Sequence, residues 1–157
     1  MYKVAIVPIM MHLSAKGEYG VLAILALCLN GGQDPVQVKT IAHKERIPLK
    51  FLEQVMNLLK RQGLVESVRG PHGGYRLSRS PEQIRLGEVL QAIEGPMIDP
   101  MLSHQKASPA SDGKVVLSEA WVGANASMQG HLDSISFQDL CDRKKRLEKV
   151  QTLMFHI

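Results

Sequence analysis

The spacing of apolar residues between positions 41 and 77 changes from a helical to a strand-like period. Pro48 suits the first position of a helix because its φ is fixed and it lacks an N–H, and Gly63 suits the position just after a helix end. Between them two stripes recur at helical spacing: Leu52, Val55, Met56 and Leu59 form the apolar one, and Lys50, Gln54, Asn57 and Arg61 the polar one. The pattern predicts a helix with one face in a core and the other offered to a polar partner.

The segments on either side of this helix complete a recognisable layout. Residues 38–45 predict a short helix, followed by a turn at 46–48. After Gly63, residues 64–69 and 75–77 are strand candidates, joined by a Gly- and Pro-rich loop. Helix, turn, helix and hairpin together predict a winged helix-turn-helix. In that arrangement the second helix enters the DNA major groove and the hairpin touches the flanking backbone or minor groove.

Two further helices are predicted around this unit. Ser14 suits the N-cap of a helix that runs to about Leu29. The sequence of this helix is apolar nearly all round, so we expect it to be buried on more than one side. Residues 87–93 predict another helix, with Val89, Leu90 and Ile93 facing the core.

A separate helix is predicted at residues 118–135, after a stretch rich in Pro, Ser, Asp and Gly that predicts a mobile loop. Its apolar residues recur at spacings of three and four and form one seam, made of Trp121, Ala124, Met128, Leu132 and Ile135. Because such a helix needs a partner, we expect a homodimer with this seam as its interface. Ser136 is expected to begin a short closing helix, and the apolar end at 150–157 either packs or frays.

The distribution of charge points to a polyanionic partner. The whole chain has 157 residues, 45% of them hydrophobic, and a net charge of +4. Residues 39–79 alone hold nine basic and three acidic residues, a net charge of +6 that exceeds that of the chain. A basic segment that coincides with a predicted helix-turn-helix favours double-stranded DNA as the partner.

Cysteine usage and hydropathy indicate a cytoplasmic protein. Cys28 and Cys141 are the only cysteines, and Cys28 lies in an aliphatic run typical of a buried thiol. Two cysteines are too few for the disulfide framework of a small secreted protein, and they fit a reducing compartment. The apolar run at 4–13 is interrupted by Pro8 and is too short to span a membrane.

The sequence offers no support for an enzyme. It contains no Ser/His/Asp set at recognisable spacing, no HxxxH or CxxC pair and no phosphate-binding loop. His72 lies in the predicted loop of the hairpin, where a turn or phosphate contact is the simpler interpretation.

Three segments resemble the small winged-helix regulators of the IscR type: residues 13–20 (LSAKGEYG), 51–79 (FLEQVMNLLKRQGLVESVRGPHGGYRLSR) and 86–95 (LGEVLQAIEG). The resemblance covers residues 11–95 well, and a weaker similarity resumes at Trp121 and ends near residue 140. It implies a homodimeric transcription regulator, with a repressor as the simplest form, which agrees with what the spacing indicates.

The predicted fold class is therefore mainly α (α+β), a winged helix-turn-helix domain with a long C-terminal dimerisation helix. We expect four parts. They are a flexible N-terminal extension at 1–10, the DNA-binding domain at 11–95, a mobile loop at 96–117, and the dimerisation helix with its tail at 118–157.

The resemblance also implies an iron–sulfur cluster in some members, held by three cysteines between the equivalents of Gly95 and Trp121. This chain has no cysteine there, and Ser118 stands where some members have a histidine. Because such clusters need soft thiolate ligands, normally four, we expect no cofactor and no metal site. Three kinds of regulatory signal then remain: a small molecule, a partner protein and cysteine oxidation.

The predicted DNA contacts divide by the part of the duplex that they reach. Lys50, Glu53 and Gln54 lie in the first turns of the recognition helix, where side chains contact base edges. Arg69 at the base of the wing is the candidate for a narrow minor groove. The remaining predicted contacts are with the backbone: Asn57, Lys60, Arg61, His72 and Arg76 through their side chains, and Gly70, Gly73 and Gly74 through a close approach.

A second interpretation is a winged helix used for protein contact, which would regulate through a partner enzyme. The basic bias of residues 39–79 argues against protein contact as the sole role.

Overall fold

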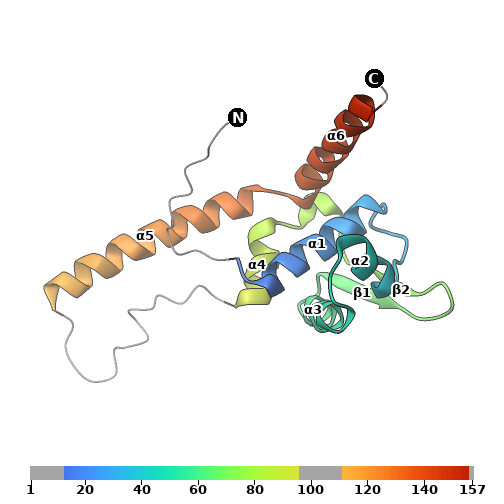
Figure 1. The fold of residues 1–157 in the computed structure, drawn as a ribbon. Coiled ribbons are helices and arrows are strands. Elements are labelled where there is room, and N and C mark those ends of the chain that lie inside the picture. The colour runs from blue at the N-terminus through green and yellow to red at the C-terminus, as the bar shows by residue number, and fades with distance from the viewer. Residues whose placement is uncertain (1–12, 96–110, 156–157) are drawn as a thin grey trace.

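The computed structural model describes residues 13–95 and 111–155 and shows helices packed around a central helix, with a two-stranded hairpin at the edge of the domain (Figure 1). The elements follow the order α1 (Ala15–Leu29), α2 (Val38–Glu45), α3 (Leu49–Arg61), β1 (Val65–Val68), β2 (Gly74–Leu77), a 3₁₀ turn η1 (Pro81–Gln83), α4 (Leu86–Glu94), α5 (Asp112–Ser134) and α6 (Phe137–Phe155). In Figure 1 the N-terminal part of α5 projects from one side of the domain and α6 rises from another. Within the described residues no helix is long and apolar enough to cross a membrane.

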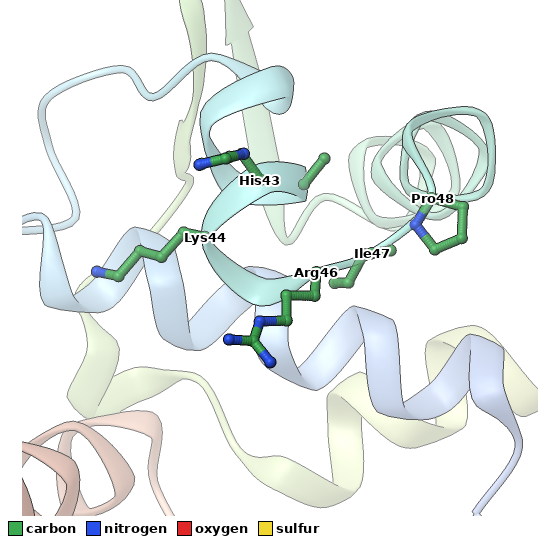
Figure 2. Close-up of a pocket in the computed structure, with 6 residues that line it drawn as sticks. His43, Lys44, Arg46, Ile47 and Pro48 are labelled. Atoms are coloured by element: carbon green, nitrogen blue, oxygen red, sulfur yellow. The ribbon is translucent and has the colours of Figure 1, made fainter.

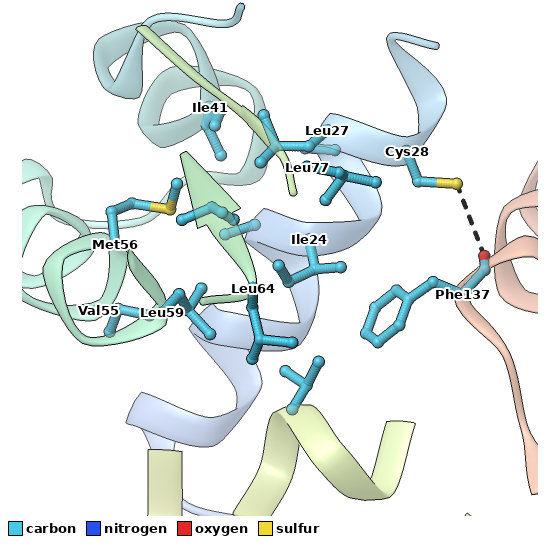
Figure 3. Close-up of a cluster of buried hydrophobic side chains, with 14 of the residues drawn as sticks. Ile24, Leu27, Cys28, Ile41, Val55, Met56, Leu59, Leu64, Leu77 and Phe137 are labelled. Atoms are coloured by element: carbon cyan, nitrogen blue, oxygen red, sulfur yellow. Dashed lines mark hydrogen bonds between the residues drawn. The ribbon is translucent and has the colours of Figure 1, made fainter. Parts of the chain in front are cut away.

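Helix α1 forms the centre of the core, as its nearly continuous apolar sequence predicts. Its N-cap is Ser14, whose hydroxyl accepts a hydrogen bond from the N–H of Gly17 at 3.0 Å. Ala23, Ile24 and Leu27 are at most 1% exposed. Side chains from α3, the hairpin and the start of α6 surround this helix (Figure 3). Burial on several sides fixes the orientation of α3 relative to the rest of the molecule.

Helices α1 and α4 approach each other closely because α1 carries a glycine at the crossing point. A Cβ on Gly20 would collide with the Cδ1 atom of Ile93, which is itself buried in α4. A larger residue at position 20 would therefore force the Ile93 side chain to move or the two helices to separate.

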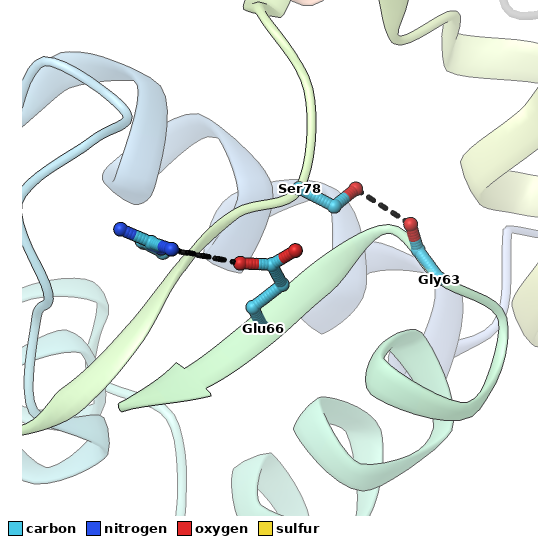
Figure 4. A network of polar contacts seen from close by, with 4 residues as sticks. Gly63, Glu66 and Ser78 are labelled. Atoms are coloured by element: carbon cyan, nitrogen blue, oxygen red, sulfur yellow. Dashed lines mark hydrogen bonds and ion pairs between the residues drawn. The ribbon is translucent and has the colours of Figure 1, made fainter. Parts of the chain in front are cut away.

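The hairpin is antiparallel, with Val65 paired to Leu77 at its base and Val68 paired to Gly74 at its tip. Ser78 donates to the carbonyl of Gly63 at 2.5 Å and joins the end of the hairpin to its start (Figure 4). An additional bridge joins Val36 to Tyr75 through two backbone hydrogen bonds of 2.8 Å. This bridge was not predicted, because one paired residue leaves no periodicity in the sequence.

Two predicted helix boundaries differ from those in the structure. Helix α3 begins at Leu49 and Pro48 is its N-cap. Helix α5 begins at Asp112, so residues 112–117 are helical although they were predicted to be loop. No proline follows Pro109, so nothing in the backbone prevents a helix there. The rest of the predicted loop and the predicted extension at 1–10 lie outside the described residues.

The closing helix was predicted to be short, but α6 contains 19 residues. Ser136 and Asp139 form a reciprocal cap at its start: the Ser136 N–H and hydroxyl donate to the Asp139 carboxylate, and the Asp139 N–H donates to Oγ of Ser136. Phe137 and Cys141 are buried against α1, at 0% and 1% exposure. The later apolar residues of α6 are exposed, namely Leu147, Val150, Leu153 and Met154.

Candidate nucleic-acid interface

Helix α3 has two faces of opposite character, as predicted. Its apolar stripe is completely buried, with 0% exposure at Leu52, Val55, Met56 and Leu59. The opposite side is exposed and holds most of the predicted DNA contacts, namely Lys50, Glu53, Gln54, Asn57, Lys60 and Arg61. Because the buried stripe locks the helix to the core, the polar stripe is presented on a rigid support.

One side-chain hydrogen bond, made by a lysine, links α3 to the hairpin. The ammonium group of Lys60 donates to the hydroxyl of Ser67 on β1 at 2.6 Å. On the same hairpin, Arg76 donates to one carboxylate oxygen of Glu66 through Nε at 3.2 Å and Nη2 at 3.1 Å (Figure 4). The pair is 42% and 50% exposed, so solvent weakens it and Arg76 can exchange Glu66 for another anion.

Three other predicted contacts carry free charge. Lys50, Arg61 and Arg69 are exposed and make no ion pair within the described part of the chain. Their positions differ, since Lys50 and Arg61 lie at opposite ends of α3 and Arg69 lies at the base of the hairpin loop. Lys50 and Arg61 therefore lie on one side of α3, and Arg69 adds an exposed charge on the wing.

Two of the three predicted contact glycines are required by close backbone packing within the chain. A Cβ on Gly73 would collide with the carbonyl oxygen of Val68, and a Cβ on Gly74 would collide with the backbone of Val36. A Cβ on Gly70 would meet nothing within 4 Å, although its φ of 116° favours glycine. Packing and backbone conformation within the chain therefore account for all three glycines without DNA, and His72 is exposed on the same loop.

The turn between α2 and α3 adds basic side chains that were not selected as contacts from the sequence. His43, Lys44 and Arg46 line a shallow depression together with Ala42, Ile47 and Pro48 (Figure 2). Arg46 ends α2 in a left-handed conformation, with φ of 55° and ψ of 42°. The charge of residues 39–79 included Lys44 and Arg46, but only the fold shows that these two side chains line one depression with His43.

Phe51 is a second omission from the predicted interface. It lies in the first turn of α3, next to Lys50, and it is 52% exposed. Its ring meets the ring of Tyr19 on α1 edge to face, with centroids 6.3 Å apart and planes at 78°. Its large exposed apolar surface beside a polar stripe was not detectable from helical spacing alone.

Helix α5 presents apolar side chains that one chain leaves uncovered. None of its 23 residues is buried, and Trp121 is 42% exposed. The predicted seam is uneven: Trp121 and Ala124 are exposed, whereas Met128, Leu132 and Ile135 are half-buried at the end that packs on α4. Val115, Val116, Leu117 and Val122 add to the exposed apolar surface of the projecting end.

The two cysteines face each other inside the core. Cys28 of α1 is 4% exposed and its thiol lies 3.7 Å from the carbonyl oxygen of Phe137 (Figure 3). Burial, with a hydrogen bond to the Cys141 thiol, raises the pKa of Cys28 to about 12. The residues that the structure describes include no group of three or more His, Cys, Asp or Glu able to hold a metal ion. Two buried thiols, one of them protonated at neutral pH, do not fit a thiolate-bound iron–sulfur cluster.

A polar recognition helix held to a basic hairpin defines the winged-helix class of DNA-binding proteins. The chain belongs to the Rrf2 family, described as iron-dependent transcriptional regulators, whose family model matches residues 13–143. It is therefore a DNA-binding transcriptional regulator and not an enzyme.

Relatives and solved structures agree with this assignment. The HTH-type transcriptional regulator IscR of Aliivibrio salmonicida is 35% identical over 130 residues, which cover 83% of this chain and 77% of the relative. IscR of Cronobacter sakazakii is 33% identical over 138 residues, 88% of this chain and 85% of the relative. Among solved structures, CymR, the global cysteine regulator of B. subtilis, has a TM-score of 0.71 at 30% identity and covers 85% of this chain and 98% of its own. IscR of T. potens has a TM-score of 0.71 at 32% identity, and the match covers 86% of this chain and 89% of the T. potens chain.

Proposed function

We propose that the protein is a cytoplasmic repressor that binds a specific DNA site as a homodimer, with α3 in the major groove and the hairpin wing in the minor groove. The observation that carries the proposal is the exposed polar face of α3, locked to the core by four fully buried side chains and joined to the wing through the Lys60–Ser67 hydrogen bond. A rigid helix of this kind places side chains at defined base pairs.

Base contacts are assigned to the first turns of α3. Gln54 suits a bidentate contact with adenine, Glu53 can accept from cytosine N4, and Lys50 can donate to guanine or to phosphate. All three side chains are exposed, and the Lys50 ammonium makes no ion pair within the described residues. Asn57 continues the same stripe one turn further along.

Backbone contacts are assigned to the far end of α3 and to the wing. Arg61 makes no ion pair with the residues that the structure describes, and it lies at the C-terminal end of the helix, where a phosphate wall is expected. Arg69 is assigned to the minor groove, with Gly70 allowing the backbone to approach. Lys60 and Arg76 supply phosphate contacts by exchanging Ser67 and Glu66 for DNA.

The homodimer is assigned to α5, with the Trp121–Ile135 seam at its centre. The projecting end of this helix leaves Trp121 and several valines in solvent, an arrangement typical of an interface. Binding to a palindromic site requires the twofold axis of such a dimer to place the two copies of α3 on one side of the assembly.

We assign the regulatory signal of this protein to an effector other than an iron–sulfur cluster. This assignment differs from the iron dependence in the family description. The two cysteines are buried together, and the Cys28 thiol has a pKa of about 12, which disfavours cluster ligation and fast oxidation. A small molecule or a partner protein is the remaining effector class. A role confined to contact with a partner enzyme is not favoured, because the cations of α3 and the wing suit a polyanion.

The test compares Gln54→Ala with Arg61→Ala on a duplex selected from random sequences. Gln54→Ala should lose about 1–3 kcal/mol on the selected site and much less on unrelated DNA. Arg61→Ala should weaken all duplexes alike and reduce the slope of log affinity against log salt by about one per subunit. If neither substitution changes DNA affinity, α3 faces another partner and the proposal is wrong.

A further inference from the structure

Phe51 has the exposure of a surface residue and the chemistry of a core residue. It is the third residue of α3, after Leu49 and Lys50, and its side chain is 52% exposed. The buried stripe of α3 takes its apolar contacts from other positions, so the core does not require an aromatic side chain here. About half of this residue is therefore available for a contact outside the core.

The ring is held in place from the side by α1. Tyr19 meets it edge to face at 6.3 Å and 78°, and Tyr19 is itself half-buried against the core. Edge-to-face contacts between aromatic rings favour one orientation. Phe51 is thus a braced apolar surface beside Lys50, and Gln54 follows it by three residues on the same side of the helix.

The major groove offers one apolar feature to such a surface. Among the four bases only thymine carries a methyl group on its major-groove edge, and the other groups there are hydrogen-bond donors or acceptors. A phenylalanine ring has no donor or acceptor for those groups. The N-terminal residues of a recognition helix are the ones that contact base edges, and Phe51 is among them.

We propose that Phe51 contacts the 5-methyl group of a thymine and so selects thymine at one position of each half-site. The inference rests on the proposed function, in which α3 lies in the major groove. It differs from the predicted polar contacts, because its selectivity comes from a methyl group and not from hydrogen bonds. Tyr19 acts as a positioning residue that holds the ring.

The experiment removes the methyl group from the DNA and the ring from the protein. A preferred duplex is first selected from random sequences with the full chain, and each of its thymines is then replaced singly by deoxyuridine, which lacks only the methyl group. For the unaltered protein, affinity should fall about threefold to fivefold at one symmetry-related position, the effect of one buried methyl group. Phe51→Ala should show no such loss there, and Phe51→Leu should retain part of it.

Leu147→Ala is the matched control, because Leu147 is a 58% exposed apolar residue on α6, far along the chain from α3. It should keep the full dependence on the thymine methyl group. Tyr19→Leu should reduce that dependence without abolishing it. Circular dichroism and melting are measured for every variant, and Phe51→Leu, which stays apolar, keeps the comparison valid if the alanine variant unfolds.

The outcomes separate the inference from the proposed function. A preferred duplex with no methyl-sensitive thymine would overturn the assignment of Phe51 alone, as would a methyl effect that Phe51→Ala leaves unchanged. An equal loss by Phe51→Ala on thymine and uracil duplexes would place the ring on the sugar-phosphate backbone and overturn it as well. Failure to select any duplex would overturn the proposed function together with this inference.

Discussion

Arg46 has an unusual backbone conformation for its residue type. Among the described residues it is the only non-glycine with positive φ, and a left-handed conformation disfavours an L-residue by about 1–2 kcal/mol. Glu45 before it pairs with Lys144 of α6 at 3.5 Å, while the exposed Arg46 guanidinium makes no ion pair in the described part of the chain. The Arg46 charge therefore lies in the turn just before the N-terminus of α3.

We expect Arg46→Gly to weaken binding to every duplex and to reduce the salt slope by about one per subunit. Stability should change by less than about 1 kcal/mol, because relief of the left-handed conformation offsets the larger entropy of glycine in the unfolded chain. Fluorescence anisotropy at several salt concentrations and urea unfolding measure the two effects. Arg146→Ala removes the same charge from α6 as a control, and a salt slope unchanged by Arg46→Gly would place the α2–α3 turn away from DNA.

The Cys28 thiol predicts a specific alkaline loss of stability. Its pKa is raised from 9.0 to about 12 in the folded state, so the folded protein keeps a proton that the unfolded chain releases. The stabilisation is fully present below pH 9 and is lost as the pH rises from about 9 toward 12. Urea unfolding of the protein and of Cys28→Ala at pH 7.5 and 10.5 should show a steeper decline for the unaltered protein, and equal declines would contradict the raised pKa.

Helix α6 depends on its cap, which is the clearest prediction for a single element. Ser136→Ala removes the hydroxyl that accepts from the Asp139 N–H and donates to its carboxylate, so we expect a loss of about 1 kcal/mol in the free energy of unfolding. Ser111→Ala is the matched control, because Ser111 occupies the N-cap of α5 with no side-chain hydrogen bond and should change stability less. An equal loss from both substitutions would show that the reciprocal cap adds nothing.

The same cap has a pH dependence of known sign. Hydrogen bonds from Ser136 lower the pKa of Asp139 below its ordinary value. The stabilisation is therefore present at neutral pH and is lost as the pH falls below about 4, through the lowered pKa of the folded state. Acid unfolding followed by circular dichroism should show a smaller pH dependence for Ser136→Ala than for the unaltered protein.

At the scale of the whole molecule, the assignment of the dimer can be tested with two alanines of α5. Ala124 belongs to the predicted seam and Ala126 lies on a different face, and both are exposed in the single chain. Ala124→Asp should convert the dimer into monomers at micromolar concentration, because it places an unpaired charge in an apolar interface. Ala126→Asp should leave a dimer. Sedimentation measures both, and a dimer that survives Ala124→Asp would assign the interface to another surface.

The absence of cluster ligands predicts the metal content of the purified protein. We expect protein made and handled without oxygen to be colourless and to contain no stoichiometric iron, because its two cysteines are buried together in the core. Visible absorption and iron analysis provide the measurement. A brown protein with about two iron atoms per subunit would show that the family's iron dependence extends to this chain.

Much of the DNA-binding unit was predictable because its determinants are local. The boundaries of α1 follow from the Ser14 cap and from the glycines after Leu29, and the buried stripe of α3 repeats with the period of a helix. The Gly-rich loop and the flanking apolar residues likewise predicted the hairpin. The exposed polar stripe of α3 was predictable for the same reason, since a helix that buries one face must expose the other.

The sequence by itself therefore determined the helices, the hairpin, the basic character of the segment and the lack of cluster cysteines. Only the tertiary structure decided which residues distant in the chain meet. It brings Tyr19 beside Phe51 and Cys28 beside Cys141, and it makes Gly74 necessary through the backbone of Val36. Such contacts depend on how separate elements pack, and packing between distant segments leaves no period or spacing in the sequence.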